Sequence, residues 1–192
     1  MSELPLIAVT DSATCPRPLA EQIERLAKLT ELRPQAVILR AKALDKAAYR
    51  TLALQAQQSC ETAGIPLILH SDWQLARKLG IQNLHLPLAF LRQISEYERA
   101  YFTWLSTSVH SVGEAQEAQA LGATVLIAGH IYTTQCKAGL APRGLGFLQS
   151  VCSAISLPVY AIGGIGFDAA QHAKLQANGA RGACVMSAYM RL

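Results

Sequence analysis

The strongest constraint on the fold is a regular alternation of short apolar runs with stretches of helical periodicity, repeated along the 192 residues. Eight of the runs have the length of a buried strand. We expect strands at residues 6–10, 36–39, 66–69, 84–86, 102–109, 124–128, 159–162 and 183–186. Helices are expected at residues 19–29, 45–62, 73–79, 113–121, 145–155 and 168–177, with a short, poorly defined helical segment at 89–101.

Uniform alternation of strand and helix implies parallel strands joined by right-handed crossovers, and eight such units close most naturally into a barrel. We therefore predict an α/β fold, a compact (β/α)8 TIM barrel that forms a single domain over residues 1–192. An open doubly wound sheet is the alternative. Its usual Gly-x-Gly-x-x-Gly turn is absent after the first strand, where Thr10-Asp11-Ser12-Ala13 stands.

The end of the chain leaves little room for a closing helix. Only residues 188–192 follow Ser187, so we expect the last helix to be short or missing. An apolar groove left there would need a partner subunit or further chain to cover it. The sequence therefore predicts a homo-oligomer, with a dimer as the simplest form.

Composition narrows the function classes. The chain is 51% hydrophobic and 16% charged, which is typical of a globular protein with a large core. A net charge of +4 without a basic stripe argues against nucleic acid and favours an anionic small molecule. With no apolar run near 20 residues and no secretory signal, we expect a cytoplasmic protein without membrane contact. The five cysteines have no Cys-x-x-Cys spacing, which argues against disulfides and a zinc knuckle.

A barrel of this kind carries its site at the carboxyl ends of the strands. The residues expected there form a cationic mouth rich in histidine, and His130 stands out among them because the flexible Gly129 precedes it and a long polar loop follows. An imidazole exchanges protons near neutral pH, so His130 is our candidate catalytic residue. His85, His110 and His130 end three successive strands and raise a zinc site as a weaker reading, since no carboxylate is evident beside them.

Two further groups of residues suit an anionic ligand. Gly163 and Gly164 follow the seventh strand, and Ser187 and Ala188 follow the eighth, where this fold commonly holds phosphate on backbone N–H groups. The alternative is that the glycines only permit close packing. Arg40 and Lys42 end the second strand and could both point toward the mouth.

Several segments together resemble the thiamine phosphate synthase and TenI superfamily over nearly the whole chain. They are Leu39-Arg40-Ala41-Lys42, residues 64–69, His85-Leu86-Pro87, Ser108-Val109-His110-Ser111, Gly129-His130 with Thr134 and Lys137, and residues 161–165. In that superfamily a synthase holds magnesium pyrophosphate with an Asn-Asp pair after the third strand and an Asp after the fourth. The matching positions here are His70-Ser71 and Phe90, with Asp72 one residue beyond the expected carboxylate.

The loop after the sixth strand is similar to the TenI pattern. Gly129, His130, Thr134, Cys136, Lys137, Gly139, Leu140, Arg143 and Gly144 all match it. The resemblance implies a thiazole tautomerase that aromatises a carboxythiazole ethyl phosphate without a cofactor or a metal, with His130 as the catalytic base and acid.

The implied substrate contacts are Arg40, Lys42, Ser108, His110, Thr134 and Lys137, with phosphate on Gly163, Gly164, Ser187 and Ala188. Two alternatives stay open: thiamine phosphate synthase, which joins hydroxymethylpyrimidine pyrophosphate to thiazole phosphate, and a non-catalytic regulatory protein that binds a phosphorylated ligand.

Overall fold

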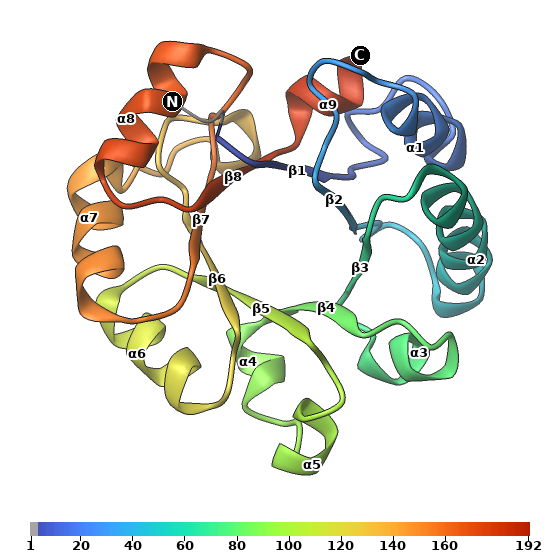
Figure 1. Cartoon of the computed structure of the whole chain (residues 1–192), viewed down its shortest axis with the longest axis horizontal. Coiled ribbons are helices and arrows are strands. Elements are labelled where there is room, and N and C mark those ends of the chain that lie inside the picture. The colour runs from blue at the N-terminus through green and yellow to red at the C-terminus, as the bar shows by residue number, and fades with distance from the viewer. Residues whose placement is uncertain (1–3) are drawn as a thin grey trace.

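Eight parallel strands close into a barrel in the order of the sequence, as a computed structural model that describes residues 4–192 shows (Figure 1). The strands are β1 Leu6–Val9, β2 Ala36–Leu39, β3 Leu67–His70, β4 Asn83–Pro87, β5 Trp104–Val109, β6 Val125–Gly129, β7 Val159–Ile162 and β8 Gly182–Val185. β1 pairs with β8 in parallel and so completes the ring. The predicted TIM barrel is confirmed, and the open sheet is excluded.

The helices surround the barrel and run between consecutive strands (Figure 1). They are α1 Leu19–Ala27, α2 Lys46–Ala63, α3 Trp73–Lys78, α4 Leu88–Leu91, α5 Glu96–Arg99, α6 Val112–Ala120, α7 Gly144–Ala154, α8 Ala169–Ala177 and α9 Ser187–Arg191, with a short 3-10 helix, η1, at Gln135–Lys137. The helical segment expected at 89–101 is two helices. Ser95 and Glu98 form a capping box that starts the second of them.

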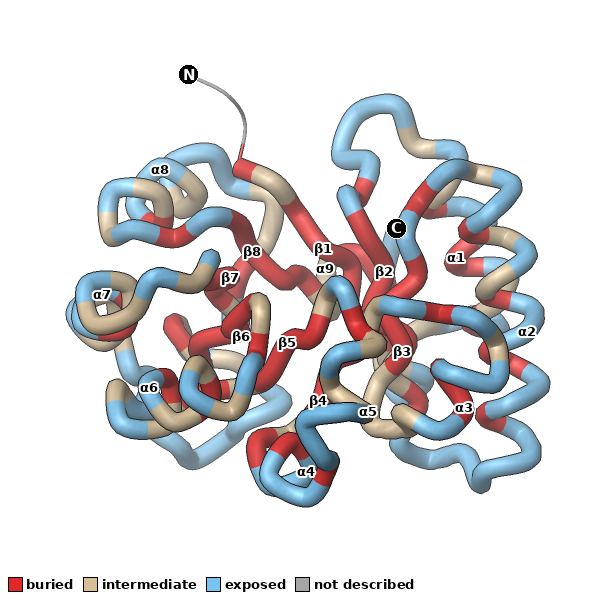
Figure 2. Tube along the Cα trace, turned by 60° about the horizontal axis from the view of Figure 1, so that its bottom comes forward, coloured by how far each residue is buried: buried red, intermediate tan, exposed pale blue. Residues whose placement is uncertain are grey.

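Side chains alternate between two apolar layers, because successive residues of a strand point to opposite faces. Ile7, Ile38, Ile68 and Ile127 belong to the cluster inside the barrel. Their strand neighbours pack in the larger layer under the helices, and Figure 2 shows the strands buried and the outer helical faces exposed. Both faces of each strand are therefore covered, as a parallel sheet requires.

The short last helix α9 covers the gap between α8 and α1. Tyr189 and Met190 of α9 are fully buried. The buried Gln22 of α1 donates to the Tyr189 carbonyl at 2.6 Å, and the Tyr189 hydroxyl donates to the Leu32 carbonyl at 2.9 Å. The last helix is short, as expected, but the expectation of an open groove beside it was wrong. Tyr189 and Met190 fill that space, although α9 has only five residues. Within residues 4–192, no helix combines the length and apolarity that crossing a membrane needs.

Candidate functional site

The candidate site lies at the carboxyl ends of the strands, where pairing brings distant segments level. Gly129 of β6 pairs with Ile162 of β7, which pairs with Cys184 of β8. The next residues, His130 and Gly163, therefore stand side by side at the mouth. On the other side, Val109 of β5 pairs with Ala128, which places His110 next to Gly129.

His130 is half-buried and held at its side chain and its backbone. Its Nε2 lies 3.4 Å from the Leu140 carbonyl, which can only accept a hydrogen bond, so Nε2 carries the proton and Nδ1 is the nitrogen left to accept one. The Arg143 N–H donates to the His130 carbonyl at 2.9 Å, which closes the base of the loop. A methyl group on Gly163 would overlap the His130 Cβ, so only glycine fits there.

The loop beyond His130 carries predicted ligand groups on an exposed turn. η1 begins after Thr134, whose carbonyl accepts from the Lys137 N–H at 3.1 Å. Lys137 and Cys136 are exposed, and Thr134 is half-buried. Within residues 4–192, the Lys137 side chain makes no hydrogen bond or ion pair, so it is available to a ligand, whereas the structure assigns no role to Cys136.

The two cations after β2 have different surroundings. Arg40 lies at the mouth, with Nη1 2.6 Å from Oδ1 of Asp11, and its side chain is 23% exposed. The Thr10 hydroxyl fixes the Arg40 backbone, since it accepts from the N–H at 2.8 Å and donates to the carbonyl at 2.9 Å. Lys42 is exposed. Asp11 therefore orients Arg40, a role that sequence reasoning missed.

A hydrogen-bonded chain inside the barrel holds His85. Its Nδ1 and Nε2 lie 3.0 Å from the hydroxyls of Ser106 and Ser108, respectively. Burial, with a smaller contribution from nearby His70, lowers the pKa of His85 to about 3, so the ring is neutral. Both ring nitrogens are engaged, which leaves none for the zinc ion considered from the sequence. The role of Ser106 could not be predicted from the sequence, because a single serine within a strand belongs to no recognisable motif.

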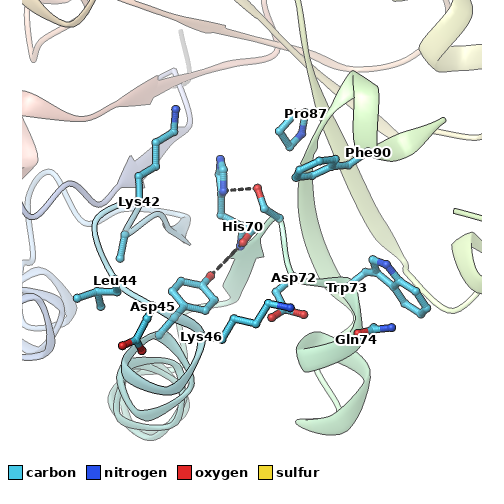
Figure 3. Close-up of a pocket in the computed structure, with 13 residues that line it drawn as sticks. Lys42, Leu44, Asp45, Lys46, His70, Asp72, Trp73, Gln74, Pro87 and Phe90 are labelled. Atoms are coloured by element: carbon cyan, nitrogen blue, oxygen red, sulfur yellow. Dashed lines mark hydrogen bonds between the residues drawn. The ribbon is translucent and has the colours of Figure 1, made fainter. Parts of the chain in front are cut away.

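His70, at one of the positions that match the acidic ligands of a synthase, lines a groove of about 590 Å³ at the ends of β2, β3 and β4 (Figure 3). Lys42, Lys46, Asp72 and Phe90 also line the groove. The His70 Nδ1 lies 2.7 Å from the Ser71 hydroxyl. Burial first, then the charges of Arg40 and Lys42, lower the pKa of His70 to about 4. At this end of the mouth, the His70 ring is therefore neutral, and Lys42 and Lys46 line the same groove.

The residues of this groove do not fit the magnesium ion that the family resemblance implies for a synthase. Magnesium prefers carboxylate and other oxygen ligands. The corresponding positions offer the His70 imidazole, the Ser71 hydroxyl bonded to it, and the half-exposed Phe90 ring. The Asp72 carboxylate accepts from the Leu75 N–H at 2.9 Å and caps α3. No group of three His, Cys, Asp or Glu suited to a metal occurs in residues 4–192.

Ser108 and His110 end β5 at the mouth, as predicted. The Ser108 hydroxyl contacts His85, and His110 Nδ1 lies 2.7 Å from the Gly129 carbonyl. Both residues are half-buried. His110 therefore touches the peptide that leads into His130.

The predicted phosphate residues lie together at the ends of β7 and β8. The β7–β8 register places Gly163 and Gly164 level with the residues just before Ser187. Within residues 4–192, the N–H groups of Gly163, Gly164, Ser187 and Ala188 donate no hydrogen bond. A Cβ on Gly164 would press on the loop at Tyr132 and Thr133. Close packing, the alternative role for these glycines, is thus present, and the free N–H groups leave phosphate binding as a proposal.

Comparisons with known proteins point to one family. A family model described as thiamine monophosphate synthase (TMP-TENI) matches residues 6–189. The thiamine-phosphate synthase of Syntrophomonas wolfei is 30% identical over 196 residues, covering 98% of this chain and 90% of that protein. The thiamine-phosphate synthase of Listeria monocytogenes is 36% identical over 147 residues, covering 74% of this chain and 67% of that protein.

Solved structures agree on the fold. The thiamine phosphate pyrophosphorylase from Pyrococcus furiosus superposes with a TM-score of 0.79 at 24% identity, over 98% of this chain and 88% of that one. FabK from Thermotoga maritima gives a TM-score of 0.73 at 17% identity, over 97% of this chain and 59% of that one. At identities this low, the superpositions show that the fold is shared and do not show a shared reaction, which has to be inferred from the residues at the mouth.

Proposed function

Because this chain belongs to the thiamine monophosphate synthase (TMP-TENI) family, we propose that it is a thiazole tautomerase of thiamine biosynthesis that needs no cofactor. The observation that supports the proposal most is the position of His130, which packs against Gly163 at the barrel mouth. There the imidazole has one nitrogen on the Leu140 carbonyl and the other available. We thus place a proton-transfer group at the mouth. The positions that match the synthase's acidic ligands hold no acidic residue.

The proposed reaction aromatises a carboxythiazole ethyl phosphate. A proton leaves the ring carbon that bears the carboxylate, and a proton is added at the exocyclic carbon. His130 removes the first proton through Nδ1. Arg40, Lys42 and Lys137 are proposed to pair with the carboxylate, and the N–H groups of the β7 and β8 loops to hold the phosphate.

Remote phosphate binding would position the ring for proton transfer. Thr134, Ser108 and His110 are proposed to complete the substrate contacts.

The second candidate is thiamine-phosphate synthase itself. The names of relatives 30–36% identical favour it. The chemistry of His70, Ser71 and Phe90 disfavours it, because these side chains supply no carboxylate and a single hydroxyl oxygen, whereas magnesium prefers carboxylate ligands. The third candidate is a protein that binds a phosphorylated ligand without turnover. Such a protein would need the phosphate site but would not need His130 as a proton-transfer group.

Two assays on the same preparation separate the candidates. In the first, the non-aromatic thiazole phosphate is incubated with the protein without added metal, and aromatisation is followed by proton NMR. In the second, hydroxymethylpyrimidine pyrophosphate, thiazole phosphate and magnesium are supplied, and thiamine phosphate is measured. We expect turnover in the first assay alone. Turnover in the second assay alone establishes the synthase, and ligand binding without turnover in either establishes the binding protein.

A further inference from the structure

His110 has one nitrogen fixed and one open. Its Nδ1 lies 2.7 Å from the Gly129 carbonyl oxygen, which can only accept, so Nδ1 carries a proton whether or not the ring is charged. Nε2 has no hydrogen-bond partner within residues 4–192 and is not among the buried unpartnered atoms. The exchangeable proton of this imidazole is therefore the one on Nε2, at the mouth.

The backbone of His110 is anchored independently of its ring. Its N–H donates to Oε2 of Glu114 at 2.6 Å, and the Ser111 hydroxyl caps α6 by accepting from the Glu114 N–H at 3.1 Å. Glu114 of α6 is thus the acidic group that holds the His110 backbone, and His130 directly follows Gly129, whose carbonyl holds the ring. This support resembles that of catalytic histidines, whose second nitrogen is oriented by a fixed acceptor.

His110 and His130 lie on either side of one peptide. His110 bonds to the Gly129 carbonyl, which is joined directly to the His130 nitrogen. The His130 side chain lies against Gly163 on the β7 side. The two neutral rings are therefore different tautomers: His130 carries its proton on Nε2, and His110 carries its proton on Nδ1.

We propose that His110 is a second proton-transfer residue, which supplies the proton to the exocyclic carbon while His130 removes the proton from the ring carbon. The inference rests on the proposed tautomerase function. The C–H electron pair becomes part of the new ring double bond, and the electron pair of the exocyclic double bond takes the Nε2 proton of the His110 imidazolium. His130 ends protonated and His110 neutral, and exchange with water restores both without another reactant.

The test compares His110→Asn and His110→Ala with the wild type in the aromatisation assay. An Asn amide can still donate to the Gly129 carbonyl, but it cannot transfer a proton at neutral pH. We expect kcat to fall about 100-fold in both variants, with partial recovery of His110→Ala by added imidazole. His172→Asn, the same change on α8, should keep the wild-type kcat. Wild-type kcat in His110→Asn would overturn the inference and leave His110 a structural anchor.

A second measurement needs no turnover. Nitrogen-15 NMR of the imidazole side chains reports which ring nitrogen is protonated, and we expect neutral His110 to carry its proton on Nδ1. A proton on Nε2 in the neutral ring would overturn the inference even if the enzyme is active. An inactive wild type with the expected His110 tautomer would instead show that the proposed function fails.

Discussion

Histidine has three different environments around this barrel mouth. His130 and His110 each place one nitrogen on a carbonyl and leave the other open, whereas His85 has both nitrogens bonded to serine hydroxyls. The spacing in the sequence predicts that all three end strands, which is wrong for His85 because it lies within β4. Spacing alone cannot separate the three environments. They depend on Ser106 and Ser108 of the neighbouring strand and on the Gly129 and Leu140 carbonyls.

The buried His85 ring makes stability depend on pH. Its folded-state pKa of about 3 lies below the usual value of about 6.5, so the unfolded chain binds the proton more readily. The stabilisation is complete above pH 6.5 and is lost as the pH falls toward 3. We expect the free energy of unfolding to fall on the order of 2 kcal/mol between pH 8 and pH 5 through this residue, at about 1.36 kcal/mol per unit.

Urea unfolding of the wild type and of His85→Asn at several pH values measures this dependence. The variant should be less stable at pH 8 and should lose less stability on acidification. An equal loss in the two proteins would show that His85 does not cause it.

At the scale of elements, the close contact between the β6 and β7 loops determines where His130 sits. Gly163 has a φ of +103° and its Cβ position is occupied by His130. We expect Gly163→Ala to destabilise the fold by about 2 kcal/mol or more and to displace His130, with loss of activity. Gly166→Ala is the matched control, because nothing lies within 4 Å of its Cβ position. Equal stability of both variants in urea unfolding would contradict this account.

The helix α9 stabilises the closure through one aromatic side chain. Tyr189 is fully buried, and its ring packs on Phe167 with centroids 4.9 Å apart. We expect Tyr189→Ala to cost about 3 kcal/mol or more in the free energy of unfolding, because it leaves a cavity and an unpaired Leu32 carbonyl. Leu192→Ala, at the exposed end of the chain, should change stability little. Similar urea midpoints for the two variants would argue against the role assigned to α9.

Strands and helices could be predicted from the sequence because buried parallel strands read as apolar runs and each helix follows one. The β2 and β7 bounds match the expected ranges, and the other strands differ by one or two residues. The packing of α9 could not be predicted, since it depends on Gln22 and Leu32, which are distant in the sequence. The same holds for Arg40, whose partner Asp11 lies on another strand end.

On the scale of the whole molecule, the predicted dimer remains a prediction whose original reason was wrong. It rested on an open groove, and α9 covers that groove. The chain has a mass of 20.7 kDa, so light scattering at high dilution should give twice that value if a dimer forms. A mass of 20.7 kDa would contradict the prediction and leave a complete barrel acting alone.

The barrel brings His110, His130 and the proposed phosphate site to one end. The family to which the chain belongs does not by itself decide between tautomerase and synthase. The side chains at the mouth favour proton transfer, and a proton-transfer reaction has an isotopic signature that a coupling reaction does not.

The most direct test is therefore proton NMR of the non-aromatic thiazole phosphate in deuterated water, with the wild type, with His130→Gln and without protein. We expect the wild type to form the aromatic product with deuterium at the exocyclic carbon, and His130→Gln to slow this about 100-fold or more. Product formation at the rate of the protein-free sample, or an equal rate in His130→Gln, would contradict it.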